Sequence, residues 1–250
     1  MNKKISSLFF SLFFLVVNVE QSKAHMDFGL DQLHFNIGIA SNYVNRGVEQ
    51  NQGQPAPFAG ADFSYPIKTL GADVYVGTWI SASHGVNTSA GLGYTKEWDN
   101  YIGIKKTIDI VTLDVGYSTY SYPGLNDHNL SLENAEYYAK VTIAPDKKPY
   151  TFGASYFLDD SQGVLNDNGQ RSDRFYYELN ATYDFGIVQS KISYGVWDRD
   201  TNTSTFTLSK ELFGIDLDLS YIYADRAKEQ TSQLTQGSKD YLTLVATKRF

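Results

Sequence analysis

Apolar and polar residues alternate with a period of two along most of this chain, whereas helical periodicity is hard to find. Residues 215–223 show the pattern clearly, because Ile215 and Leu217 alternate with Asp216 and Asp218. Alternation of this kind predicts β-strands with one apolar and one polar face. The pattern recurs about 12 times, in segments near 33–43, 61–67, 72–80, 97–105, 111–118, 135–143, 150–156, 175–183, 188–196, 206–212, 215–223 and 242–250.

The connections between these segments alternate in length. Short turns are expected at 68–71, 106–108, 145–148, 185–186 and 213–214. Long polar loops are expected at 46–57, 83–96, 122–134, 159–173, 198–203 and 225–238. Barrels that cross an outer membrane have tight periplasmic turns at one end and longer external loops at the other. The sequence therefore predicts an all-β fold, an antiparallel transmembrane β-barrel of about 12 strands with both termini on the periplasmic side.

A soluble barrel would show the same alternation with its apolar face inside, so periodicity alone leaves both architectures open. Three features favour a membrane barrel whose apolar face contacts lipid. Tyrosine, with 19 copies, clusters near the strand ends, where aromatic girdles are expected. Charges on the polar face of nearly every strand suit a wet lumen. The last strand ends in Phe250, and such a terminal aromatic resembles the signal read by the outer-membrane assembly machinery.

The first residues predict a secretory signal peptide. Lys3 and Lys4 precede an apolar run over 5–19, and small residues follow at 22–24. An uncleaved anchor is the alternative, but the run is shorter than the ~20 residues that span a bilayer. We expect a signal peptide over 1–24 and an outer-membrane barrel over 25–250.

If the polar face points inward, the lumen is lined by more acids than bases. The acidic residues are Asp62, Asp73, Glu97, Asp99, Asp114, Glu136, Glu178, Asp184, Glu211, Asp216 and Asp218. The basic residues are Arg46, Lys105, Lys140, Arg174, Lys191 and Arg249. Clustered charge of one sign concentrates counter-ions in a narrow channel. This predicts passive diffusion of small solutes through a weakly cation-preferring or neutral lumen.

Two other arrangements of the lumen stay open. The carboxylates can instead pair with the bases and fill a narrow, closed barrel. Inward aromatic residues can form a track for neutral sugars or aromatics, or lock the lumen by packing; they are Tyr75, Trp79, Tyr101, Tyr138, Tyr176 and Trp197.

One stretch, SNYVNRGVEQ at 41–50, carries a family likeness together with Pro55-Ala56 and the GADF at 60–63. It resembles the opening signature of the TorF family of proteobacterial porins, and weaker matches follow in order at 75–79, 97–103, 114–124 and 136–138. Asn45 and Glu49 depart from the family pattern. The resemblance implies an outer-membrane barrel with a pore function and no established substrate. The motif residues that carry it are Ser41, Asn42, Tyr43, Arg46, Gly47 and Gln50.

Other functions have weaker support in the sequence. A hydrolase needs a histidine beside a nucleophile; His84 and His128 lie in expected external loops without a nucleophile motif, so we predict no enzyme. Asp159-Asp160 and Asp167 do not have the spacing of a calcium loop, and no cofactor is expected. The net charge of −7 argues against nucleic acid. An adhesion or receptor barrel that presents external loops remains an alternative.

Overall fold

The computed structural model describes residues 32–51, 53–88, 91–123, 134–160, 164–165, 171–172, 174–197, 201–226 and 238–250. The expected signal peptide at 1–24 lies outside these residues. In the part of the chain that the structure describes, no helix is long and apolar enough to cross a membrane.

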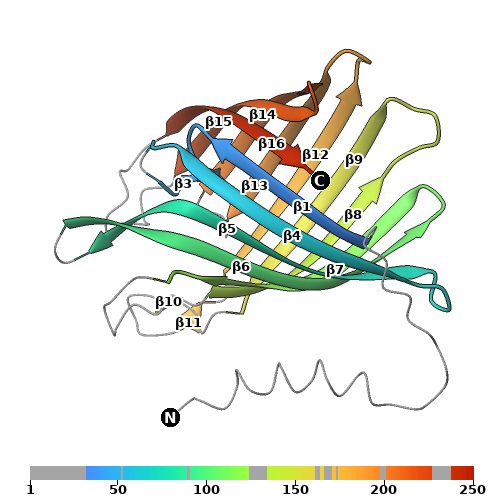
Figure 1. The fold of residues 1–250 in the computed structure, drawn as a ribbon, viewed down its shortest axis with the longest axis horizontal. Helices are drawn as coiled ribbons and strands as arrows, with labels where there is room; N and C mark the ends of the chain where they lie inside the picture. Colours follow the sequence, from blue (N-terminus) through green and yellow to red (C-terminus); the bar gives the residue numbers. More distant parts are fainter. Residues whose placement is uncertain are drawn as a thin grey trace, which may run out of the picture. The chain divides into compact units, whose positions relative to one another are not determined.

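Twelve antiparallel strands form a closed barrel. Each strand pairs with its neighbours along the chain, and β1 closes the barrel against β16 (Figure 1). This confirms the predicted architecture and strand number. The strands are β1 (Leu33–Ala40), β4 (Ala56–Ile67), β5 (Ala72–Thr88), β6 (Gly91–Ile108), β7 (Val111–Ser121), β8 (Asn134–Ile143), β9 (Tyr150–Asp159), β12 (Phe175–Asp184), β13 (Gln189–Trp197), β14 (Thr201–Leu212), β15 (Ile215–Arg226) and β16 (Lys239–Arg249).

Two short hairpins lie outside the barrel sheet. One consists of β2 (Val44–Asn45) and β3 (Val48–Glu49), which pair with each other between β1 and β4. The other consists of β10 (Val164–Leu165) and β11 (Arg171–Ser172), between β9 and β12. The first of these hairpins forms part of the site described below.

The short turns gather at one end of the barrel, as predicted. Phe213 and Gly214 join β14 to β15 with φ values of 54° and 72°. Positive φ at both central residues is the mark of a type I′ turn, whose twist matches that of the flanking strands.

Three predicted connections have different bounds in the structure. The turn expected at 106–108 follows Ile108, because β6 continues until Ile108 pairs with Val111. The loop expected at 83–96 is a β-hairpin, since β5 extends to Thr88 and β6 begins at Gly91. The loop expected at 198–203 is shorter, because β14 already begins at Thr201. In each case cross-strand hydrogen bonding extends past the point where the apolar alternation fades.

The outer surface of the barrel is apolar. Leu179 and Ile192 are each 58% exposed, and Leu242 is 69% exposed. A continuous exposed apolar surface of this kind is typical of a lipid-facing barrel. Other exposed apolar side chains are Phe35, Ile37, Val76, Ile102, Val115, Phe152, Phe206, Leu219 and Leu244. The polar residues that alternate with them therefore belong to the inner face.

Candidate functional site

The connection between β1 and β4 turns into the barrel, although the sequence predicted an external loop at 46–57. Residues 42–47 line a cavity together with inward residues of β9 and of β12 to β16. Val44 packs against a buried cluster formed by Ile222, Ala224 and Tyr241. We call residues 41–51 the inner hairpin. It contains the motif that resembles the TorF signature.

Hydrogen bonds within the inner hairpin fix its shape. The backbone N–H of Gln50 donates to the Tyr43 carbonyl at 2.8 Å, and the Tyr43 N–H donates to Asn51 Oδ1 at 2.9 Å. Asn42 Nδ2 donates to Glu49 Oε1 at 2.8 Å. Asn51 is fully buried. The motif therefore encodes a self-supporting turn that enters the lumen.

Arg46 and Gly47 form the tip of this hairpin, with φ values of 49° and 79°. They join the paired residues Asn45 and Val48 as a two-residue turn. A Cβ added at Gly47 would clash with the Thr203 hydroxyl, so the tip needs glycine for its space as well as for its φ.

The side chain of Arg46 crosses the lumen to β8. Its Nη1 and Nη2 donate to the two carboxylate oxygens of Glu136 at 2.9 and 2.7 Å. The guanidinium carbon lies 3.9 Å from the ring centre of Phe157, 4.9 Å from that of Tyr176 and 5.2 Å from that of Trp197. The pair is largely buried, with 14% of the Arg46 side chain and 9% of the Glu136 side chain exposed. Such a two-pronged pair is strong and directional.

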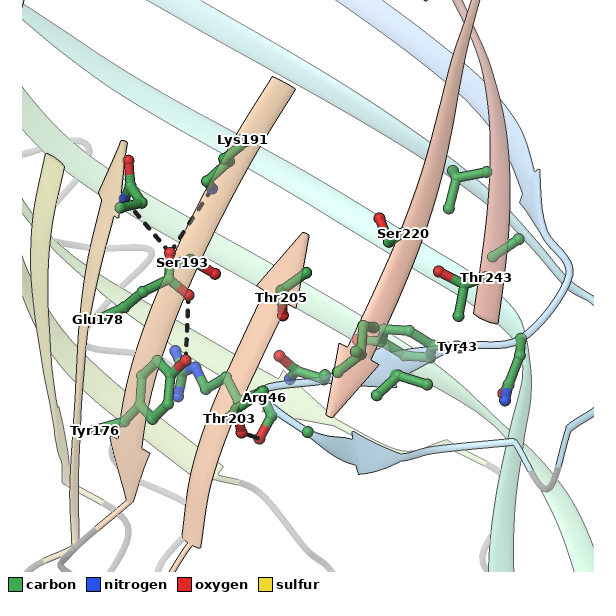
Figure 2. Close-up of a pocket in the computed structure, with 18 of the residues that line it drawn as sticks. Tyr43, Arg46, Tyr176, Glu178, Lys191, Ser193, Thr203, Thr205, Ser220 and Thr243 are labelled. Carbon is green, nitrogen blue, oxygen red and sulfur yellow. Dashed lines mark hydrogen bonds and ion pairs between the residues drawn. The ribbon is translucent and has the colours of Figure 1, made fainter. Parts of the chain in front are cut away.

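The backbone of Arg46 is also held by the barrel. Trp197 Nε1 and Thr203 Oγ1 donate to its carbonyl at 3.2 and 3.3 Å. Figure 2 shows Arg46 beside Tyr176 and Thr203, below the Glu178 and Lys191 side chains. The tip is thus fastened to β8, β13 and β14 at once.

The protonation states of the hairpin side chains follow from their surroundings. Burial acts to lower the pKa of Arg46, but the hydrogen bond and charge of Glu136 outweigh it and raise that pKa. Burial raises the pKa of the Tyr43 phenol well above its ordinary value, and the charges of Glu97 and Asp99 add to the rise. Arg46 therefore stays charged, and Tyr43 stays a donor, to Glu97 Oε1 at 3.2 Å.

Tyrosines, more often than basic residues, partner the inward carboxylates on the side of the lumen formed by β4 to β8. The Tyr75 hydroxyl donates to Asp114 and lies 2.6 Å from the Tyr138 hydroxyl, which connects β5, β7 and β8. The Tyr101 hydroxyl donates to Asp62. In the same way, Tyr120 donates to Glu136. We call this side the tyrosine–carboxylate wall.

Side chains of β12 to β16 form a different inner surface. Glu178 accepts from Tyr176 at 3.2 Å and lies 3.7 Å from Lys191 Nζ (Figure 2). Five other side chains of these strands that line the larger cavity carry neutral hydroxyls. We call this side the hydroxyl wall; its hydroxyl residues are Ser193, Thr203, Thr205, Ser220 and Thr243.

Two cavities lie within the barrel on either side of the Arg46–Glu136 pair. The larger, of about 660 Å³, is lined by the inner hairpin and the hydroxyl wall and includes Arg46. The smaller, of about 580 Å³, is lined by the tyrosine–carboxylate wall and includes Glu136. Lys140 and Phe157 line both cavities. The pair therefore stands where the two spaces meet.

The structure brings many of the predicted lumen residues together. Asp62, Lys105, Asp114, Glu136 and Lys140 line the smaller cavity. In the larger cavity, Lys140 lies with Glu178 and Lys191. Their role in lining a conducting pore stays a prediction.

The remaining predicted lumen residues lie outside these two cavities. Glu97 is buried and bound by Tyr43, and its neighbour Asp99 has a buried Oδ1 without a hydrogen-bond partner among the described residues. Asp73 pairs across the strands with Lys105.

The others lie near strand ends: Arg174 precedes β12 and Asp184 ends it, Glu211 is the second-last residue of β14, Asp216 and Asp218 are the second and fourth residues of β15, and Arg249 ends β16. Asp216 bonds to Arg249. Asp218 is half-buried on β15. Arg174 is held through its backbone, because its carbonyl accepts a hydrogen bond from the Asp159 N–H. Phe250, the expected assembly signal, is 66% exposed and pairs through its backbone with Phe35.

Sequence reasoning did not assign Tyr120, Phe157 or Thr203 to the lumen. Alternation could have found Phe157, because it follows the outward Tyr156, which is 44% exposed. No local pattern could have predicted that these residues meet Arg46, since they lie on three different strands.

The structure describes few of the candidate enzyme and calcium residues. His128 and Asp167 lie outside the described residues, as does the side chain of His84. Asp160 accepts a hydrogen bond from Tyr117 at 3.1 Å. Among the described residues, no group of three or more histidine, cysteine or acidic side chains is placed to hold a metal ion.

Comparison with solved structures shows the same fold in outer-membrane channels. An outer membrane channel from Pseudomonas putida F1 superposes with a TM-score of 0.51 at 10% identity, over 87% of this chain and 93% of that one. The NanC porin superposes with a TM-score of 0.50 at 12% identity, over 85% of this chain and 97% of that one. No curated protein sequence matches the chain significantly. Residues 28–208, however, match the profile of a family described as "Bacterial protein of unknown function (Gcw_chp)". The chain therefore belongs to the Gcw_chp family.

Proposed function

We propose that the protein is a bacterial outer-membrane channel for the passive diffusion of small solutes. The observation that carries the proposal is the closed barrel with an apolar outer face and a polar interior that contains two cavities. A barrel of this kind shields its backbone from lipid and offers polar groups to a solute inside. The fold shared with outer-membrane channels supports it. The proposal assigns no catalytic residue.

The proposal includes a preference for cations. The smaller cavity is lined by Asp62, Asp114 and Glu136 against Lys105 and Lys140. All three carboxylates accept hydrogen bonds from tyrosine. Glu136 is also paired with Arg46, whereas tyrosine satisfies Asp62 and Asp114 without cancelling their charge. Uncancelled negative charge within a narrow lumen attracts cations.

The proposal also covers export and assembly. We infer that residues 1–24 are removed as a signal peptide and that residues 25–250 form the mature barrel. Phe250 would then serve the outer-membrane assembly machinery at the end of β16. The resemblance of residues 41–50 to the TorF porin signature supports membership of that channel family.

Conductance in planar bilayers under a KCl gradient tests this function. The refolded protein is expected to give a current whose reversal potential shows cation preference. An anion-selective reversal potential would refute the preference, and the absence of any current from both this protein and a folded variant without the inner hairpin would refute the channel. This variant replaces residues 41–51 by a short glycine linker. If only the variant conducts, the hairpin blocks the lumen; if neither protein conducts, the walls block it.

One observation favours a second candidate, a closed barrel with a structural or adhesion role. The inner hairpin spans the lumen and is fastened on three strands, so the two cavities meet at an occupied point. If neither the wild-type protein nor the hairpin deletion conducts while both fold, this closed barrel becomes the better description.

A further inference from the structure

The guanidinium of Arg46 fills a pocket that other parts of the barrel build. The pocket consists of the Glu136 carboxylate on β8 and the rings of Phe157, Tyr176 and Trp197 on β9, β12 and β13. All four belong to barrel strands. Arg46, which occupies the pocket, comes from the inner hairpin. The pocket and its occupant therefore belong to different parts of the fold.

The chemistry of the pocket matches a planar, delocalised cation. The two carboxylate oxygens accept from two different nitrogens of one fork, which an ammonium ion cannot imitate. The ring of Phe157, with its centre 3.9 Å from the guanidinium carbon, supplies a π face. Tyr120 donates to the same carboxylate and helps to orient it.

The charge around the pocket also favours a cation. Glu97 and Glu136 both lie close enough to Asp99 to interact with it electrostatically. A second cation near the pocket is Lys140, whose Nζ lies 4.4 Å from the Tyr138 ring centre and 5.7 Å from that of Phe157. If Arg46 left, Glu97 and Glu136 would still outnumber Lys140 among these residues.

We propose that this carboxylate–aromatic pocket is a recognition site for small solutes that carry a guanidinium group, and that Arg46 occupies it as a tethered internal ligand. A solute of this class replaces Arg46, and the tip of the inner hairpin then leaves the point where the two cavities meet. The site thus names a substrate class for the proposed channel; its use in transport rests on that function, whereas binding itself does not.

The test is the binding of guanidinium chloride to an Arg46→Ala variant, refolded in detergent and checked for folding by heat-modifiable electrophoretic mobility. Trp197 lines the pocket, so its fluorescence reports occupancy; Trp79→Phe and Trp98→Phe remove the other two tryptophans. Titration stays in the low millimolar range, far below denaturing concentrations. Sodium chloride is adjusted to keep the ionic strength constant.

The expected result is a saturable fluorescence change in Arg46→Ala that is absent or at least tenfold weaker in the protein that retains Arg46. Urea, which has the same shape without charge, and ammonium, which has charge without the planar fork, should not reproduce it. Adding Glu136→Gln should weaken guanidinium binding at least tenfold. If Arg46→Ala fails to fold, Arg46→Gln keeps more of the packing and takes its place.

Equal responses to guanidinium and urea, or binding that survives Glu136→Gln, would overturn the proposal. So would the absence of binding in a folded Arg46 variant. Bilayer recordings on the same preparations separate the two claims. Binding without any current would support the recognition site and refute the channel. Current without binding would support the channel and refute the recognition site.

Discussion

The two walls of the lumen accommodate polar side chains inside the barrel in different ways. On the tyrosine–carboxylate wall, phenols of β5, β6 and β7 bond to acids on other strands, and the Tyr75 and Tyr138 hydroxyls meet at 2.6 Å. On the hydroxyl wall, neutral side chains such as Ser193 and Thr205 face the larger cavity. Burying charge requires partners, whereas a hydroxyl can face water at little cost. The first wall is therefore cross-linked, and the second leaves room for a solute.

The inner hairpin connects these walls. Arg46 bonds to Glu136 on one and receives hydrogen bonds from Trp197 and Thr203 on the other. Its removal should therefore affect the molecule more than any change confined to one wall.

Arg46→Ala has the largest expected effect, because it leaves the Glu136 carboxylate buried without its cation. The free energy of unfolding should fall by about 3–5 kcal/mol, measured by urea unfolding from lipid vesicles. Lys191→Ala is the matched control: its partner Glu178 lies 3.7 Å away and the lysine side chain is 45% exposed. Its loss should cost about 1 kcal/mol or less, and equal costs would show that Arg46 does not bridge the walls.

Tyr75→Phe should have the next largest effect, since it removes the donor to Asp114 and the contact with Tyr138. The expected loss is about 1–3 kcal/mol, the cost of leaving buried polar groups unsatisfied. Thr205→Val on the hydroxyl wall should change stability by about 0.5 kcal/mol or less. If the two substitutions cost the same in urea unfolding, the walls do not differ in cross-linking.

Gly47→Ala should loosen the tip of the inner hairpin through backbone strain and a clash with Thr203. A cost of about 1–3 kcal/mol is expected. Gly53→Ala carries a similar φ of 72°, but its added Cβ would lie 3.7 Å from the nearest atom, Glu49 Oε1. The difference between the two variants in thermal unfolding isolates the clash, and a zero difference would place the tip away from Thr203.

Much of this architecture could be predicted from the sequence. Period-two alternation assigns each strand and its outward face, because every second side chain of a lipid-exposed strand must be apolar. Segment 215–223 shows this directly: it became β15, with Leu219 and Tyr221 about half exposed.

The inner hairpin could not be predicted in the same way. Its residues are polar and lack period-two alternation, so the sequence predicts an external loop. Only the contacts of Arg46 with Glu136, Phe157 and Trp197 show that the hairpin lies inside the barrel. Those partners lie 90 or more residues away along the chain. The tyrosine partners of the carboxylates escaped prediction for the same reason, since Tyr75 and Asp114 are 39 residues apart.

A double substitution, Asp62→Asn with Asp114→Asn, should have the smallest effect of these variants. It removes charge from the tyrosine–carboxylate wall and keeps acceptors for the phenols. The cation-to-anion permeability ratio, taken from reversal potentials in a KCl gradient, should fall by about twofold. Thr243→Asn on the hydroxyl wall should leave the ratio unchanged, and a fall there instead would assign selectivity to the wrong wall.

Cysteine accessibility tests the central claim, that the polar face lines a conducting path, most directly. The chain contains no cysteine, so Ser193→Cys and Ile192→Cys each introduce a single thiol, on neighbouring residues of opposite faces. During bilayer recording, a charged methanethiosulfonate reagent should reduce the current of Ser193→Cys and leave that of Ile192→Cys unchanged. A reduction at Ile192→Cys alone, or no effect at Ser193→Cys, would contradict it.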